Sequence, residues 1–205
     1  MTLKKYLPIK AFITFFLILP TLLLISGCAS SPDPIDPKDK NRSVVFGFFD
    51  MEDAPSWGGI DWVSVKQYKP KKGYFSAAVD EGLFYHVGVP NGSFQVDEFG
   101  RNTRFYSNTR YSYNFGGKGR NQTARKIKKP GAYFMGSYKY KAIDSGSIWK
   151  PDNFQMVKSK GPSEKVLLKK LLKIMQSDSD LSIYKHQIRR MKQRLKQLSK
   201  KRSKK

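Results

Sequence analysis

The first 28 residues limit how much of this 205-residue chain can take part in a folded domain. Three lysines within the first ten residues precede an apolar stretch, residues 11–25, and two small residues follow it. A membrane-spanning helix needs about 20 apolar residues, so this shorter stretch is typical of the apolar part of a secretory signal. We therefore expect residues 1–27 to be a signal peptide that is removed on export.

The single cysteine of the chain, Cys28, follows this segment directly. Ile25-Ser26-Gly27-Cys28 resembles the lipobox of bacterial lipoproteins, in which an aliphatic residue and two small residues precede the cysteine. The resemblance implies cleavage between Gly27 and Cys28 and acylation of Cys28, with palmitate among the attached lipids. Lipid on this thiol would also remove the oxidation hazard of a lone exported cysteine. Ala29 rather than Asp comes next, which by the enterobacterial sorting rule implies an outer-membrane lipoprotein facing the periplasm.

Removal of 27 residues from 205 leaves 178, enough for one domain with appendages. Residues 28–42 hold the lipidated cysteine and a polar, Pro-rich segment, which we predict to be a tether. Residues 43–160 are predicted to form the domain. Residues 161–205 are predicted to be a basic helical extension.

Residues 43–158 have the composition of a β-rich domain. Aromatic and β-branched residues recur in short runs between Gly, Pro and Asn clusters. The predicted strands are 44–49, 62–68, 83–89, 93–99, 104–107, 110–115, 132–141 and 154–158. Several of them carry bulky residues on both faces, so we expect an antiparallel β-sandwich-like domain. The aromatic residues within 105–115 are interpreted as a hairpin with one face inward, with glycan stacking as the alternative.

Two predicted strands begin in the same way. Pro90-Asn91-Gly92 and Pro130-Gly131 each precede a strand that opens with an aromatic residue. These strand starts resemble those of small transthyretin-like or carboxypeptidase-regulatory-like sandwich domains, which include uncharacterised families of bacterial lipoproteins. The resemblance implies a sandwich fold and no particular function.

Two helices are predicted after residue 163. The first places its apolar residues between 166 and 175 on one side, and the Ser-Asp-Ser-Asp segment 177–180 ends it and caps the next. The second carries an apolar seam with spacings of three and four, formed by Leu181, Tyr184, Ile188, Met191, Leu195 and Leu198. This seam predicts packing on the first helix, docking of a protein partner, or a homodimer.

The rest of the second helix is cationic. Residues 181–205 include eleven basic residues and no acidic one, in a chain of net charge +23. Like charges one helical turn apart repel, so we expect either solvated charges or an anionic ligand. The candidate anion-binding residues are Lys185, Arg189, Arg190, Lys192, Arg194, Lys196, Lys200, Lys201 and Arg202. Anionic lipid and peptidoglycan are the expected partners; nucleic acid is not expected, because export removes the chain from it.

The chain ends in Lys205, after a lipidated cysteine and a heptad helix. These features resemble the major murein lipoprotein, which implies a covalent bond from the terminal lysine side chain to the peptidoglycan stem peptide. The ending Ser203-Lys204-Lys205 departs from the aromatic-basic-lysine ending of that family, and the β-rich domain has no counterpart there.

No catalytic, cofactor or metal site is predicted. The two histidines, His86 and His186, are far apart in the sequence, zinc ligands are too few, and no nucleophile-elbow pattern occurs. The sequence therefore predicts a membrane-anchored, non-enzymatic binding or structural lipoprotein of the cell envelope. Two alternatives remain: a subunit of an envelope or secretion assembly docked through the C-terminal helix, or an envelope enzyme with polar groups around His86 in a concave pocket.

Overall fold

The computed structural model describes residues 35–54, 59–103, 109–115, 119–143 and 153–202. The expected signal peptide, its cleavage point at Gly27 and the lipidation site Cys28 lie outside the described residues. The same holds for the predicted strand 104–107 and for Lys205.

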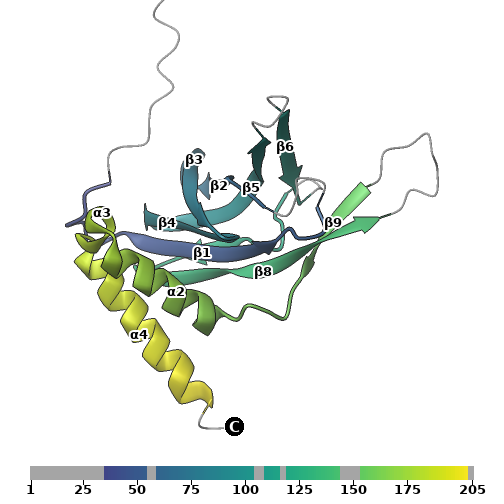
Figure 1. The fold of residues 1–205 in the computed structure, drawn as a ribbon. Coiled ribbons are helices and arrows are strands. Elements are labelled where there is room, and N and C mark those ends of the chain that lie inside the picture. Colours follow the sequence, from purple (N-terminus) through teal and green to yellow (C-terminus); the bar gives the residue numbers. More distant parts are fainter. Residues whose placement is uncertain (1–34, 55–58, 104–108, 116–118, 144–152, 203–205) are drawn as a thin grey trace, which may run out of the picture. The chain divides into compact units, whose positions relative to one another are not determined.

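The described residues form one curled sheet that is followed by three helices (Figure 1). The strands are β1 (Ser43–Asp50), β2 (Trp62–Lys69), β3 (Gly73–Asp80), β4 (Leu83–Val89), β5 (Gly92–Thr103), β6 (Thr109–Asn114), β7 (Arg125–Ile127), β8 (Ala132–Ile143) and β9 (Asn153–Lys158). Their order across the sheet is β6-β5-β2-β3-β4-β1-β8-β9, and β7 pairs with β5. The helices are α2 (Glu164–Ser177), α3 (Ser179–Ser182) and α4 (Lys185–Arg202).

The prediction of a mainly β domain with a C-terminal helical extension is confirmed, but the sheet is not purely antiparallel. β1 pairs with β8 in parallel, whereas its other neighbour, β4, is antiparallel. The described strands also join into a single mixed sheet and do not form two separate sheets. The bulky two-faced strands that suggested a sandwich have another cause, because one of their faces is covered by helices.

The inner face of the curled sheet holds an aromatic core. Phe49 of β1 stacks on Phe84 and Phe99, with ring centroids 4.8 and 4.2 Å away. Tyr113 of β6 meets Phe154 of β9 edge to face at 5.3 Å, so rings from the first and last strands of the order pack against each other. Such offset and edge-to-face pairs stabilise beyond the area they bury. The aromatic residues of β6 therefore point inward, as the hairpin interpretation predicts.

The outer face of β1 and β4 is covered by α2 and α4. Strand residues alternate between the two faces, and the outward ones form a second apolar cluster with the helices. Its fully buried members are Val44, Phe46, Leu83, Leu168, Leu171, Met175 and Met191. Figure 1 shows the helices on the side of β1 and β8 away from β2, β5 and β6.

Seven of the eight predicted strands are observed, and two observed strands, β3 and β7, were not predicted.

A two-residue turn at Glu81 and Gly82 joins β3 to β4. Both residues have positive φ, 46° and 80°, as tight hairpin turns require. Lys170 of α2 binds at this turn, with its Nζ 2.7 Å from an Asp80 carboxylate oxygen and 2.8 Å from one of Glu81.

We predict that Phe49→Ala lowers the free energy of unfolding by about 3–5 kcal/mol, because it leaves a cavity among four aromatic rings. Urea denaturation followed by tryptophan fluorescence measures this loss. The control is Val166→Ala, at a side chain that is 57% exposed on α2, for which we expect a change within about 0.5 kcal/mol. Equal effects of the two substitutions would contradict the position of the core.

Candidate anion-binding helix

The apolar seam packs within the chain, but on two helices: Leu181 lies in α3, Tyr184 precedes α4, and the other four residues lie in α4. Met191 is fully buried, and the other five seam residues are partly buried against the cluster between the helices and the sheet. The seam thus packs on the first helix, as the packing alternative predicts. Asp178 ends α2 and caps α3, since its carboxylate accepts hydrogen bonds from the backbone amides of Asp180 and Leu181. While α4 is packed in this way, the seam is not free for another protein.

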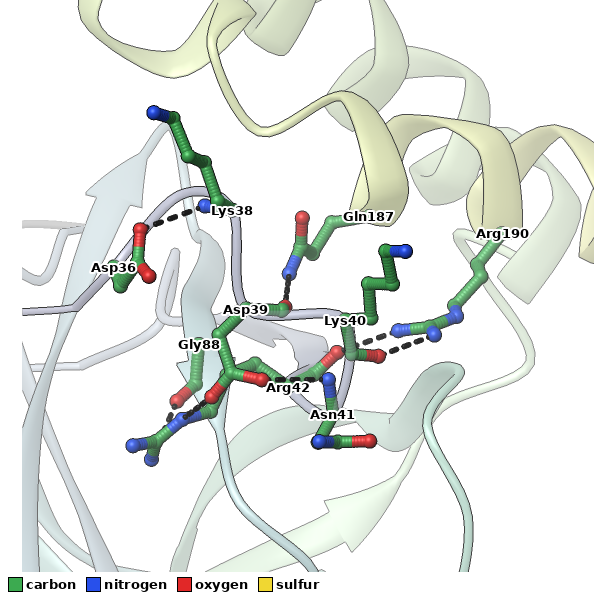
Figure 2. A network of polar contacts seen from close by, with 9 residues as sticks. All are labelled: Asp36, Lys38, Asp39, Lys40, Asn41, Arg42, Gly88, Gln187 and Arg190. Atoms are coloured by element: carbon green, nitrogen blue, oxygen red, sulfur yellow. Dashed lines mark hydrogen bonds and ion pairs between the residues drawn. The ribbon is translucent and has the colours of Figure 1, made fainter.

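A second contact binds α4 to the start of the domain (Figure 2). Arg190 donates hydrogen bonds from its two terminal nitrogens to the carbonyl oxygens of Arg42, at 2.8 Å, and Lys40. Gln187, which is fully buried, donates to the carbonyl of Asp39 at 3.2 Å. We call residues 39–42 together with Gln187 and Arg190 the N-terminal latch.

Residues 39–42 of the latch are also held by hydrogen bonds among themselves. The Asp39 carboxylate accepts from the Asn41 amide at 2.7 Å and from the Arg42 guanidinium at 2.8 Å (Figure 2). These contacts, the Asn41 amide first, hold the pKa of Asp39 below its ordinary value. Ile35 packs against Gly88, so the chain from Ile35 onwards lies on the domain. Residues 35–42, the last eight of the segment 28–42 that was predicted to be a tether, thus lie within the described domain.

A third contact joins the two helices at the far end of the hairpin. Arg194 binds the carboxylate of Glu164 through two nitrogens, at 2.7 and 3.0 Å. Glu164 is the first residue of α2 and its side chain is largely buried. This two-point ion pair raises the pKa of Arg194 above its ordinary value.

Four other cations of α4 form one exposed stripe. Lys185, Arg189, Lys192 and Lys196 follow one another at spacings of four, three and four residues, which places them on one face of the helix. All four are exposed, and none has a side-chain hydrogen bond or ion pair with any residue that the structure describes. We call these four residues the cationic stripe.

The structure thus separates the nine candidate anion-binding residues into groups. Arg190 and Arg194 bind other parts of the chain and do not belong to the cationic stripe. Lys200 is exposed near the end of α4. Lys201 and Arg202 continue the helix, but their side chains lie outside the described residues.

The sequence did not reveal the latch. Gln187, Arg190 and Arg194 lie on one flank of the seam, at spacings of three and four, and this flank faces the domain. The neutral side chain of Gln187 gave no signal, because Gln193 and Gln197 of the same helix are also neutral and are exposed. The partners on residues 39–42 are backbone carbonyls, which a sequence does not display.

We predict that Arg190→Ala lowers the free energy of unfolding by about 1–2 kcal/mol, since it leaves carbonyl groups of the latch unpaired. The neighbouring substitution Arg189→Ala is the matched control, because Arg189 is exposed and has no such contacts. Urea denaturation measures both. A loss for Arg189→Ala that equals the loss for Arg190→Ala would contradict the latch.

His86 does not lie in a polar pocket. Its Nδ1 lies 2.8 Å from the carbonyl oxygen of Ser76, its ring contacts Phe75, and its shielded Nε2 has no partner among the described residues. A hollow of about 420 Å³ elsewhere is lined by Gln95, Asp97, Glu98, Asn114, Phe115, Gly119 and Asn121, without His86. Within the described ranges, no group of three or more His, Cys, Asp or Glu side chains is placed to hold a metal ion.

The same burial predicts a pH dependence of stability. Removal from water lowers the pKa of His86 below its ordinary value of 6.5, although the Ser76 carbonyl opposes the shift. The unfolded chain therefore binds a proton at higher pH than the folded chain does. The free energy of unfolding contributed by neutral His86 is fully present above about pH 7 and falls as the pH drops below about 6.5.

We expect His86→Gln to flatten this fall, because glutamine can donate to the Ser76 carbonyl without titrating. The measurement is the urea midpoint between about pH 7 and pH 5, with His186→Gln as the control. An unchanged slope in His86→Gln would contradict the assignment.

Comparison of the chain with protein-family models, with curated proteins and with solved structures found no match. None of the described helices is long and apolar enough to cross a membrane.

Proposed function

We propose that this protein is a lipid-anchored component of the bacterial cell envelope, attached through Cys28, whose cationic stripe binds a polyanionic surface. In this proposal it is a non-enzymatic binding or structural protein of the outer membrane that faces the periplasm. The observation that carries the proposal is the stripe of four exposed cations that have no partner among the described residues, on a helix whose other faces contact the domain.

The stripe costs stability. Its successive members are one helical turn apart, and each like-charge pair at this spacing costs about 0.2–0.5 kcal/mol. The first turn of α4 contains no acidic residue, so the positive end of the helix dipole also faces Lys185. Folding alone would favour acidic residues at these positions, which supports a role in binding.

The expected affinity is modest. Each basic group near an anionic surface contributes about 1 kcal/mol, so four give about 4 kcal/mol. That free energy corresponds to a dissociation constant of about 1 mM. Binding of this strength becomes useful when a second attachment holds the protein in place, and the proposed lipid on Cys28 is such an attachment.

The contacts of α4 favour anion binding over docking of a protein partner through the seam. The seam residues pack on α2 and the sheet, whereas the stripe faces solvent. Binding through the stripe is electrostatic and should weaken as salt shortens the Debye length.

A neutralised stripe tests the proposal. The full protein, extracted in detergent, is applied to a phosphate-bearing matrix and eluted with rising salt. Replacing Arg189, Lys192 and Lys196 by Gln removes three charges and should weaken binding roughly 100-fold, at about 1 kcal/mol per charge. Because these three side chains are exposed and bind no other part of the chain that the structure describes, the variant should fold normally.

The matched control replaces three cations of α2, Lys165, Lys169 and Lys173, by Gln and so changes the net charge equally. We expect this control to elute close to the unaltered protein. Equal loss in both variants would show that binding follows net charge alone, and the proposal would then be wrong.

A further inference from the structure

We propose that the polyanion bound by the cationic stripe is the anionic headgroup surface of the same membrane that holds the lipid anchor. The inference rests on the proposed function and names its partner. It makes α4 a second membrane contact of one protein molecule, in addition to the lipid.

The latch carries this inference, because it places α4 beside the point where the anchor segment enters the domain. Gln187 and Arg190 bind residues 39–42 (Figure 2). Lys185 of the stripe lies two positions before Gln187, and Arg189 directly precedes Arg190. The chain that leads to the proposed anchor therefore joins the domain at residues that contact the first half of α4. The end of β8 at Ile143 is far from this region, eleven residues along an extended strand whose first residue, Ala132, pairs with Val44.

Chain length limits the distance from the lipid. Ile35 lies seven positions after Cys28 in the sequence. An extended chain spans at most about 3.5 Å per position, or about 25 Å over this stretch. A linker this short gives an effective concentration in the millimolar range. This range matches the dissociation constant of about 1 mM expected for the stripe. The stripe should therefore bind the membrane to which the protein is tethered, and should not bind an untethered membrane of the same charge density.

The corner between α3 and α4 supplies an apolar side chain for the same surface. Ile183 is 50% exposed and lies two residues before the first cation of the stripe. The nearby carboxylates of Asp178 and Asp180 are both exposed and oppose binding. The four cations of the stripe outweigh these two charges.

The experiment uses two matched exposed isoleucines. In the acylated protein Cys28 carries lipid, so a new cysteine is the one free thiol for a fluorophore that reports polarity. Ile183→Cys places the label beside the stripe, and Ile143→Cys, at a side chain 42% exposed, places it at the far end of β8. Both acylated proteins are reconstituted into vesicles of phosphatidylcholine, with or without phosphatidylglycerol.

We expect the label at position 183 to shift to shorter wavelength and to be quenched by lipid-borne quenchers in the vesicles with phosphatidylglycerol. The shift should be lost without phosphatidylglycerol, at about 1 M salt, where the Debye length is about 3 Å, and with the neutralised stripe. The label at position 143 should not respond. Equal responses at the two positions, or a response at 183 that ignores lipid charge, would overturn the inference.

The phosphate matrix separates this inference from the proposed function. Stripe-dependent retention on the matrix without a lipid response at position 183 leaves the proposed function intact and makes another polyanion, such as peptidoglycan, the partner. If neither the retention on the matrix nor the lipid response at position 183 depends on the stripe, both the proposed function and this inference are wrong. Mass spectrometry of the membrane-extracted protein tests the anchor, and an unmodified Cys28 would overturn the inference at its origin.

Discussion

Burial of β1 and β4 on both faces is the constraint on which the rest of the structure depends. Val45 and Phe84 point into the curled sheet, and Val44, Phe46 and Leu83 point to the opposite side. The inner face is closed by the curl, which brings aromatic rings of β6 and β9 together. The outer face would remain a large exposed apolar patch without α2 and α4. The basic extension is therefore a layer of the domain, and its cations can be used only where this layer faces solvent.

The sequence predicted the strands better than their arrangement. Runs of aromatic and β-branched residues located β1, β4 and β8, because these strands are stabilised by what their own side chains bury. β3 was not predicted, because its glycine, serine and alanines have weak strand propensity. Its pairing with β2 and β4 stabilises it in the sheet. The parallel pairing of β1 with β8 joins segments almost ninety residues apart and leaves no local signal. Bulk on both faces of a strand likewise does not reveal whether a sheet or a helix covers it.

The sequence predicted which helix carries the exposed cations, but it did not predict which of its cations are exposed. Periodicity located the seam, because apolar residues at spacings of three and four must share one face. Composition could not separate Arg190 and Arg194 from Arg189 and Lys192, since all four are cations within six residues. Their roles differ through partners elsewhere: carbonyls of residues 40 and 42, and the carboxylate of Glu164.

The division of cations on α4 argues that the stripe serves something other than folding. Where a cation stabilises this fold, it has a defined partner, as Arg190, Arg194 and Lys170 do. The stripe residues have none within the described chain, repel one another, and begin at the helix end where positive charge is least favoured. Unfavourable charges that no other part of the described fold offsets indicate that a ligand outside the fold offsets them. In the proposed function, an anionic surface near the anchor would supply that compensation.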